Sequence, residues 1–559
     1  MNRKMWRFFP PPPVGLSKQL GLSPFQAHLL YNRGVTSPEL AERYWSKDIN
    51  QLHDPLLLPD IEKAIERLRK AFETKEAIAI FGDFDTDGVT GTALLVTVLE
   101  NLGLKTIPYI PHRVEEGHGL NPHALKELKA AGASLLITVD CGTTSVEEIK
   151  FANSIGLDVI ITDHHSIPPV LPEACAVINP NRPDSSYPFK GLAGVGLAFK
   201  LTQAIYQDIG QPYPPGCLEL VALGTIADVA PLQGENRTLV THGLKALNAG
   251  SRPGLLQLMA CAGVALGSVD TETVAFALVP RLNAAGRLGH AKISLRLLTT
   301  TSTEEAAALA RQLEEMNYQR RKLTEEALAS VRPKTQAQLS QGRMLILGEE
   351  GLAPGILGLI ASRFVDEFYR PVIAYSTSNG IVRASARSIP EFNISAALAT
   401  CSDMFIRHGG HPQAAGFTME TRLFPQLEKK MREVAAEKLQ GLDLNPSIRI
   451  DAEAPISLLA GDNLNFLRNL APFGQGNHLP ALLTRNAEIY DVSPVGSDSQ
   501  HLSVRLKQGR SFWNAMAFRS GDRFGELKGR MDLVFTVSTA IWRSQETLKL
   551  NILDFRPSR

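Results

Sequence analysis

Short apolar segments alternate with helical patterns between residues 77 and 180, and this alternation restricts the region to a layered α/β fold. The helical patterns include Ala93–Leu99 and Pro122–Ala131, where apolar residues recur at helical spacing. Together they predict a parallel sheet with helices on both faces. The predicted strands are 77–83, 104–110, 134–140, 158–162 and 174–179.

Three of these strands end on side chains that can bind metal ions. In an open parallel sheet, ligands gather outside the carboxyl ends of the strands, so the three endings should meet at one site. Carboxylates crowded in this way repel one another unless a cation lies between them. We therefore expect a divalent metal site, and the many oxygen ligands favour manganese or magnesium. The side chains concerned are Asp83, Asp85, Asp87, Asp140, Asp163, His164 and His165.

None of these residues would identify the site alone. The Asp83–Asp87 segment could be a solvated acidic turn, Asp140 a helix N-cap, and a single histidine a surface residue. Asp228, which closes the apolar helix predicted for 218–227, could likewise be a helix cap. The metal interpretation depends on their occurring together at strand ends.

Composition excludes several classes of protein. The chain has 559 residues, too many for one core, so we expect three or four domains. The net charge of +1 gives no overall sign of a nucleic-acid binder, although a local basic lining could still hold a polyanion. Five scattered cysteines without CxxC spacing suit a reducing cytoplasm. We expect neither a secretory signal nor a membrane span.

Outside the predicted sheet, the pattern divides the chain into further regions. Ser302–Arg332 should be one long helix, which either bridges two lobes or packs as an ordinary core helix. Short strands near the end, several with alternating apolar residues, predict a small all-β barrel, either an oligonucleotide-binding (OB) fold or a structural barrel. These predicted strands are His501–Leu506, Phe512–Phe518, Asp532–Val537 and Leu548–Leu553. The expected domains are a helical lead-in (1–75), a parallel-sheet catalytic domain (76–300), a connecting helix (301–333), a second α/β domain (334–442) and an OB-like barrel (443–559).

Four ordered motifs resemble those of the DHH phosphoesterase family, and within it the RecJ-type single-stranded-DNA exonucleases. The motifs are Gly82–Gly91, Thr138–Gly142, Thr162–His165 and Gly224–Pro231. Further similar segments follow at 280–289, 385–390, 409–416 and 472–477. The resemblance covers nearly the whole chain from about residue 50. It implies a DHH domain, a bridging helix, a DHH-associated domain and an OB-like barrel.

The resemblance implies two metal ions, usually manganese, and gives the site residues separate roles. Asp85 and Asp87 match the paired motif aspartates, and Asp83 can complete the shell of the first metal. Asp140 matches the bridging carboxylate. The remaining matches are His164 and Asp228 as ligands of the second metal, His165 facing the scissile phosphate, and Asp163 as an orienting residue.

A second set of residues is implied in substrate binding. Arg113 with Ser385 and Arg387 resembles a pocket for a terminal 5′ phosphate, which guanidinium groups suit. Gly409, Gly410 and His411 are expected in a Gly-rich turn that presents amides to an anion. Close approach of a nucleic-acid backbone is expected near Arg281, Asn283 and Arg287, whose neighbours are small.

The resemblance therefore implies a metal-dependent exonuclease that degrades single-stranded DNA from the 5′ end to 5′ mononucleotides, in recombination and repair. A single-strand-binding protein and a helicase are possible partners. The alternatives are a phosphoesterase for short oligonucleotides or cyclic dinucleotides, and a non-catalytic replication scaffold, against which the intact ligand set argues. One departure is Leu352-Ala353, where the family usually has Trp-His, so the contact that this histidine makes is absent here.

Overall fold

The computed structural model describes residues 4–509, 511–542 and 545–558, and the chain forms two compact units. The first, which we call the catalytic unit, contains 52–230 and 238–444. The second, the barrel unit, contains residues 4–51, 231–237 and those from 445 onward. Part of the predicted lead-in thus belongs with the C-terminal region, whereas helix α4 (Ile61–Thr74) belongs to the catalytic unit.

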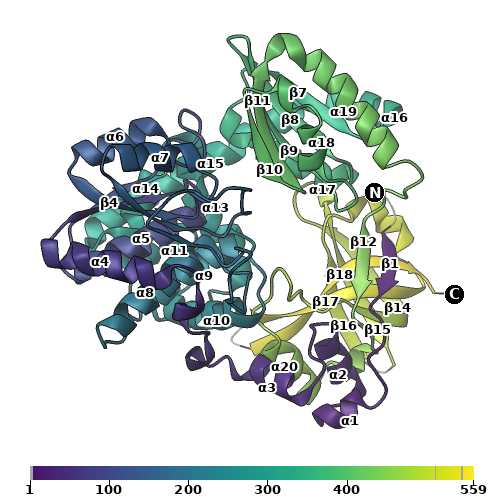
Figure 1. Cartoon of the computed structure of the whole chain (residues 1–559). Helices are drawn as coiled ribbons and strands as arrows, with labels where there is room; N and C mark the ends of the chain where they lie inside the picture. The colour runs from purple at the N-terminus through teal and green to yellow at the C-terminus, as the bar shows by residue number, and fades with distance from the viewer. Residues whose placement is uncertain (1–3, 510, 543–544, 559) are drawn as a thin grey trace. The chain divides into compact units, whose positions relative to one another are not determined.

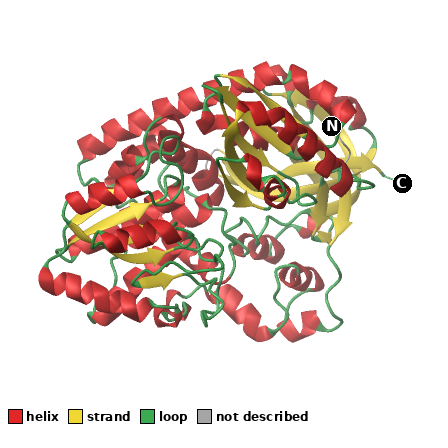
Figure 2. Ribbon diagram, turned by 45° about the horizontal axis from the view of Figure 1, so that its top comes forward, coloured by secondary structure: helices red, strands yellow, loops and turns green. Residues whose placement is uncertain are grey.

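A five-stranded parallel sheet forms the centre of the first α/β domain, as predicted (Figures 1 and 2). Its order is β3-β2-β4-β5-β6, so β2, the first of its strands along the chain, lies between the second, β3, and the third, β4. The chain therefore reverses its direction of travel across the sheet between β2 and β4, which is where ligands bind in such folds. The strands are β2 (Ala77–Gly82), β3 (Thr106–Tyr109), β4 (Ala133–Val139), β5 (Asp158–Thr162) and β6 (Ala176–Ile178).

Helices cover both faces of this sheet, and a mainly helical region follows it (Figure 2). Strands β2, β4 and β5 are almost wholly buried, which explains why they are continuous apolar runs. The helices are α5 (Thr86–Asn101), α6 (Pro122–Ala130), α7 (Val146–Ser154), α8 (Gly194–Asp208), α9 (Cys217–Ala227), α10 (Gly234–Ala249), α11 (Pro253–Cys261), α13 (Val279–Leu288) and α14 (Lys292–Thr299).

The long helix predicted after Ser302 is α15 (Thr303–Val331). The Ser302 hydroxyl accepts a hydrogen bond from the Glu305 N–H at 3.2 Å, and this cap starts the helix. Helix α15 packs against α11, α13 and α14 and also against α17 (Leu357–Phe368) and β7 of the second α/β domain. It therefore joins the two α/β domains of the catalytic unit.

The second α/β domain has a mixed sheet of order β10-β11-β9-β8-β7, in which only β7 and β8 are parallel. The expected Gly-rich turn was wrong, because Gly409, Gly410 and His411 lie in strand β10 and pair with β11. Gly410 lets these strands approach closely, because a Cβ there would lie 2.4 Å from Ala415 Cα, whereas a Cβ on Gly409 would meet no atom within 4 Å. The elements are α16 (Pro333–Gln341), β7 (Leu345–Glu350), β8 (Val372–Ser378), β9 (Ile381–Arg387), α18 (Ile394–Ala399), β10 (Arg407–His411), β11 (Ala414–Glu420) and α19 (Phe424–Lys438).

The barrel unit contains a closed five-stranded barrel of order β14-β15-β16-β18-β17, with β17 pairing back to β14. This strand order is that of an OB fold. Leu502, Val504 and Leu506 alternate into its core. Helices α2 (Pro24–Tyr31), α3 (Pro38–Ser46) and α20 (Asp462–Asn469) contribute to the same core. The barrel strands are β14 (Leu482–Val495), β15 (His501–Gln508), β16 (Ser511–Ala517), β17 (Arg530–Trp542) and β18 (Gln545–Pro557).

One element of the barrel unit contradicts the expectation of a wholly helical N-terminal region. Met5–Phe8 forms strand β1, which pairs in parallel with β12 (Ser447–Ile450). Tertiary pairing with a distant segment determines this strand, and so local sequence does not show it.

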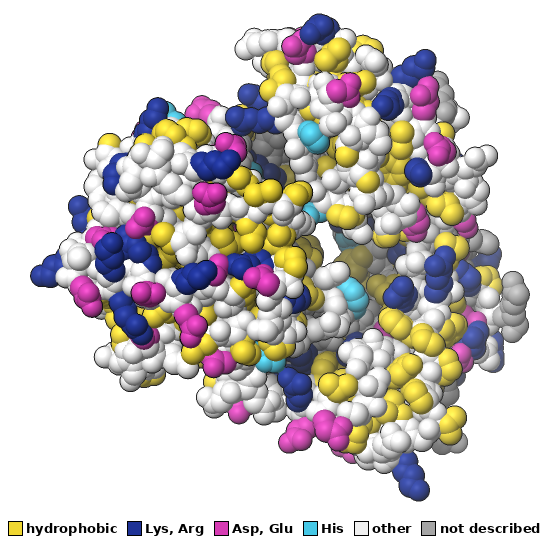
Figure 3. Space-filling view, in the orientation of Figure 1, with side chains coloured by type: hydrophobic (Ala, Val, Ile, Leu, Met, Phe, Trp, Pro, Cys, Tyr) yellow, Lys and Arg dark blue, Asp and Glu magenta, His cyan; other side chains and the backbone are white. Residues whose placement is uncertain are grey.

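The surface carries charges of both signs. Figure 3 shows Lys and Arg side chains interspersed with Asp and Glu over the visible face, in keeping with the net charge of +1. All five cysteines are free. Over the described part of the chain, no helix combines the length and apolarity needed to cross a bilayer.

Candidate metal centre

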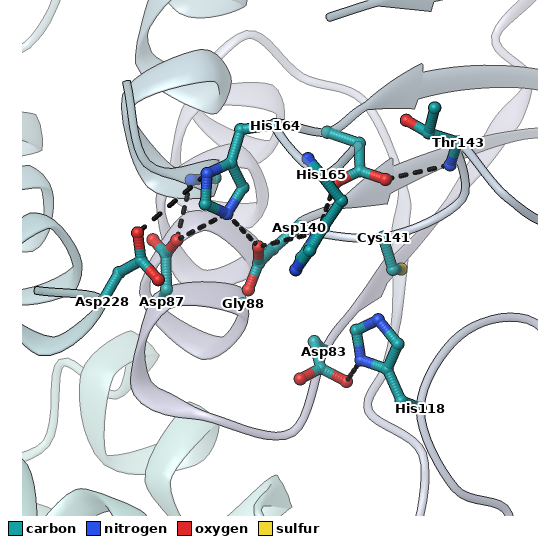
Figure 4. Close-up of polar contacts among 12 residues, drawn as sticks. Asp83, Asp87, Gly88, His118, Asp140, Cys141, Thr143, His164, His165 and Asp228 are labelled. Atoms are coloured by element: carbon teal, nitrogen blue, oxygen red, sulfur yellow. Dashed lines mark hydrogen bonds and ion pairs between the residues drawn. The ribbon is translucent and has the colours of Figure 1, made fainter. Parts of the chain in front are cut away.

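The predicted ligands meet at the carboxyl ends of β2, β4 and β5, which are neighbours in the sheet (Figure 4). Asp83 follows β2 directly, Asp140 follows β4, and Asp163 and the two histidines follow β5. Asp228 reaches the same place from the C-cap of helix α9. Residues from four separate segments therefore form one site at the topological switch point between β2 and β4.

Two glycines permit the close packing on which this site depends. A Cβ on Gly194 would lie 2.5 Å from the Asp140 Cβ, and one on Gly224 would lie 2.8 Å from Asp87 Oδ1. Real Cβ contacts do not occur at such distances, so any larger residue would displace a carboxylate. Helices α8 and α9 can approach the ligands only because glycine occupies these positions.

The ligand atoms form three overlapping groups, and the atoms within each group lie within 4.8 Å of one another. Asp140 belongs to two of these groups, and its Oδ1 is 3.0 Å from His164 Nε2. The arrangement is therefore suitable for a carboxylate shared between two cations, the role that the resemblance implies for Asp140. The groups are Asp83 with Asp85 and Asp140, Asp140 with His164 and His165, and Asp87 with His164 and Asp228.

The electrostatics of the carboxylates provide a test of whether a cation fits. Burial, together with Asp83 and Asp87, raises the pKa of Asp85 to about 6. Burial and the charge of Asp87 raise the pKa of Asp228 to about 8, and burial and neighbouring carboxylates also raise that of Asp140. Ionising these groups together is thus unfavourable without a counter-charge. A divalent cation supplies that charge, and the oxygen-rich donor set fits it.

Asp87 has a structural role as well. Its carboxylate accepts hydrogen bonds from the backbone N–H groups of Gly194 at 2.7 Å and Val195 at 2.8 Å, and so it holds the N-terminus of α8. Asp85 acts similarly on α5, where it accepts from Asp87 N at 2.9 Å and Gly88 N at 3.2 Å. Both residues are therefore fixed by helix ends before any ion binds.

Asp163 does not belong to any of the three ligand groups but orients His165. Its Oδ1 lies 2.7 Å from His165 Nδ1, and its Oδ2 accepts from the Thr143 N–H at 2.9 Å. Burial alone would raise the pKa of Asp163, but the hydrogen bond to His165 and the nearby charge hold it well below the usual range. Asp163 is therefore an ionised partner that fixes the imidazole, as expected for an orienting residue.

Sequence reasoning missed His118. Its Nδ1 lies 2.9 Å from Asp83 Oδ1, and its ring centroid is 5.4 Å from that of His165. Burial would lower its pKa, but Asp83 raises it to about 9. The sequence signal for His118 is its place between Gly117 and Gly119 in the loop that carries Arg113, and the structure shows both glycines at positive φ.

His411 stacks on His165 with ring centroids 5.7 Å apart. Both residues border a cavity of about 520 Å³ beside the ligands. The strand that replaces the expected turn thus still brings His411 to the site. The cavity is lined by His164, His165, Ser166, Ile167, Asn181, Asp228 and His411.

The substrate-binding predictions separate into two groups. Arg113, Arg287 and Arg387 lie close enough to influence one another electrostatically. Arg281 instead forms an ion pair with Glu314, and Asn283 Oδ1 accepts from both the N–H and the hydroxyl of Thr86 at 3.0 Å. Asn283 therefore supports the loop that carries Asp85 and Asp87.

The departure at Leu352-Ala353 has a structural explanation. Both residues are partly buried against the apolar core formed by α17, β7 and β8. They contribute packing and no polar group to the site.

Comparison with known proteins agrees with this organisation. Residues 77–225 match the DHH family, N-terminal domain, residues 341–439 the DHHA1 domain, and residues 450–554 the RecJ OB domain.

Whole-chain relatives extend the similarity. The single-stranded-DNA-specific exonuclease RecJ of Bacillus subtilis is 36% identical over 96% of this chain and 69% of its own length. RecJ of Escherichia coli is 33% identical over 96% of this chain and 94% of its own length. The crystal structure of RecJ in complex with Mn²⁺ from Thermus thermophilus aligns over all of this chain and 80% of its own, with a TM-score of 0.86 and 30% identity. The chain therefore belongs to the RecJ family of DHH proteins.

Proposed function

We propose that this chain is a nuclease that hydrolyses single-stranded DNA from its 5′ end, with two divalent ions, and releases 5′ mononucleotides in recombination and repair. The observation that best supports this proposal is that carboxylates and imidazoles from four segments form three ligand groups at one edge of the sheet. Relatives at 33% to 36% identity carry the name single-stranded-DNA-specific exonuclease, which supports the substrate.

Different residues of the chain would bind the ions and contact the scissile phosphate. Asp83 and Asp85 would hold one ion, Asp87, His164 and Asp228 would hold the other, and Asp140 would contribute to both. When bound, such ions lower the pKa of an attacking water and neutralise charge that develops on the phosphate. His165, fixed by Asp163 through Nδ1, presents its other ring nitrogen for contact with a phosphate oxygen.

An aromatic and basic surface on the barrel supports a single-stranded substrate. Tyr490 and Phe512 are 61% and 45% exposed, with ring centroids 5.1 Å apart. Arg505 lies over both rings, at 5.5 Å and 4.9 Å. Exposed rings beside guanidinium groups bind single strands by stacking and charge. We call this surface, formed by Tyr490, Arg505, Lys507 and Phe512, the barrel platform.

A backbone irregularity exposes Tyr490. The pairing of β14 with β15 shifts register between Ile489 and Asp491, which leaves Tyr490 as the extra residue of a bulge. By contrast, Trp513 is only partly exposed and packs against the barrel core, and the Trp542 side chain lies outside the described residues. Neither belongs to the platform.

The decisive experiment supplies manganese and compares 5′-labelled single-stranded DNA, duplex DNA and a dinucleotide. Early release of label as a mononucleotide from the long single strand supports the proposal. Preference for the dinucleotide would indicate the small-substrate phosphoesterase, and absence of turnover would indicate a scaffold.

The free cysteines suit a reducing compartment, and we propose the cytoplasm. We also propose a single-strand-binding protein and a helicase as partners of this chain, which the resemblance implies.

A further inference from the structure

Four arginines of the catalytic unit are held together without carboxylate partners. Arg287 Nη1 donates to the Gly355 carbonyl at 3.0 Å, Arg387 Nη1 to the Ser385 hydroxyl at 3.1 Å, and Arg320 Nη2 to Asn317 Oδ1 at 2.8 Å. The Arg113 guanidinium lies 4.6 Å from the centre of the Phe84 ring. Within the described ranges, no ion pair joins any of the four to a carboxylate. Asp83 and Asp85 offset part of the charge of Arg113 through space, and the remaining positive charge of the four arginines is available to an anion.

A continuous series of contacts brings three of these arginines together. Phe84, beneath Arg113, has its carbonyl 3.0 Å from the place of a Cβ on Gly286, the neighbour of Arg287. Gly355 packs on the Arg287 carbonyl, where a Cβ would come within 2.1 Å. At Gly358, a Cβ would lie 3.0 Å from Arg387 Nη2 and 3.2 Å from the Ser385 hydroxyl. The loop after β2, helix α13 and strand β9 therefore meet at one place.

Arg320 approaches the same place from α15. Met316 packs on Gly289, just beyond the end of α13, with Met316 Cε 3.2 Å from the place of a Cβ. Arg320 is one helical turn further along the same face of α15. Its Nε is buried and has no hydrogen-bond partner in the described structure. One donor of a fixed guanidinium is therefore left for a ligand.

The charges of this cluster act on one another. Burial first, and then Arg113, Arg320 and Arg387, lower the pKa of Arg287 to about 9. Arg281 differs, because Glu314 neutralises it. An anion bound among the four would relieve their repulsion.

We propose that Arg320 is a specificity-determining residue: it adds a fourth guanidinium to the phosphate pocket that the resemblance implies for Arg113 and Arg387, and so strengthens the distinction of a phosphate monoester from a diester. The inference rests on the proposed function, since the monoester would be the 5′ end of the strand. A monoester carries nearly two negative charges and three acceptor oxygens, whereas an internal diester carries one charge and has fewer free oxygens. A fourth guanidinium adds a charge-assisted hydrogen bond that only the monoester can fully use. The site would also bind inorganic phosphate without DNA or metal.

The first test measures binding without hydrolysis. The full chain in EDTA is titrated with inorganic phosphate or dimethyl phosphate at constant ionic strength, and thermal unfolding is followed. We expect phosphate to bind at least tenfold more tightly than dimethyl phosphate, and Arg320→Gln to weaken phosphate binding by about tenfold to a hundredfold. Arg321→Gln is the matched control, because it removes the same charge from an exposed neighbour on the same helix. Equal phosphate affinity in the two variants overturns the proposal.

A second variant keeps the proposal testable if the first one does not fold. If Arg320→Gln does not fold, Arg320→Lys keeps the charge but loses Nε and the planar fork. We expect its phosphate affinity to fall severalfold below that of Arg321→Gln, and equality would again overturn the proposal.

The last test uses the reaction. With 5′-phosphorylated single strands, Arg320→Gln should raise KM about tenfold relative to Arg321→Gln, and with 5′-hydroxyl strands the two should agree. Equal losses on both substrates overturn the specificity role. A chain that binds phosphate through Arg320 but cleaves no DNA would refute the proposed function while leaving the anion site intact.

Discussion

Asp163 Oδ1 lies 2.7 Å from His165 Nδ1, and the same oxygen accepts the backbone N–H of His165 at 3.1 Å. One carboxylate therefore fixes both the ring and the backbone of the residue that is proposed to face the phosphate. Because the two residues are separated only by His164, rotation of either would also disturb a ligand. The arrangement makes Asp163 a positioning residue.

We expect Asp163→Asn to lower kcat about 10- to 100-fold with little change in KM, because an amide cannot fix the His165 tautomer as a carboxylate does. Steady-state rates on single-stranded DNA with manganese measure this. Glu173→Gln, an exposed acid-to-amide change, should leave the rate unaltered. A wild-type kcat for Asp163→Asn would show that His165 needs no such partner.

Asp140 is the carboxylate that two ligand groups share, so Asp140→Asn should disturb both. We expect hydrolysis to fall by about 10³-fold or more, because loss of metal-derived stabilisation costs several kcal/mol. Calorimetric titration with manganese should show weaker binding in both sites, whereas Asp228→Asn should weaken one. Normal activity of Asp140→Asn at saturating manganese would mean that the assigned site is wrong.

The raised pKa of Asp228, about 8 against an ordinary value of 3.8, predicts a pH dependence for the metal-free protein. Between these values the native state holds a proton that the unfolded state has released. Stability should therefore fall as pH rises from about 4 to about 8. Metal competes with that proton, and so manganese should raise Tm more at pH 8.5 than at pH 6.

Comparison with Asp228→Asn isolates this effect from other titrating groups. In EDTA, the variant should lose less Tm than the wild-type chain between pH 6 and pH 8.5. Parallel curves for the two proteins would show that Asp228 does not titrate as described.

Local patterns predicted the site better than the barrel, for physical reasons. The apolar runs before Asp83, Asp140 and Asp163 are buried on both faces, and such strands are continuous in sequence. Strand β14, missing from the predicted strands, spans 14 residues but has register shifts near Asn486 and Tyr490, which break the alternation.

Contacts between distant residues explain most of what the sequence could not show. Asp87 meets Gly194 across 107 positions, and Arg320 reaches the arginine cluster only because α15 packs beside α13. No periodicity encodes such pairs. Glycine pairs are also ambiguous: Gly409-Gly410 predicted a turn, but both lie in a strand, where the close approach of β11 explains Gly410 alone.

Asn283 is expected to stabilise the loop that carries Asp85 and Asp87, and its substitution tests this. Asn283→Ala leaves the N–H and hydroxyl of Thr86 without their acceptor, which should lower the free energy of unfolding by about 1–3 kcal/mol. Urea unfolding in EDTA measures this, and manganese affinity should fall as well. Asn248→Ala removes hydrogen bonds to the backbone of Leu244 and Val269, neither of which adjoins a ligand, and is a suitable control. Its manganese affinity should be unchanged even if stability falls.

The barrel platform predicts a defect confined to long substrates. Phe512→Ala should raise KM for a long single strand about 5- to 100-fold, because loss of one stacked base costs about 1–3 kcal/mol. Its effect on a dinucleotide should be small, since a dinucleotide bound for cleavage leaves no further bases to stack on the platform. Phe524→Ala is the matched control, because Phe524 is also 45% exposed in the barrel unit but lies outside the platform. If both substitutions raise KM equally, exposed aromatic area in general, and not the platform, accounts for the effect.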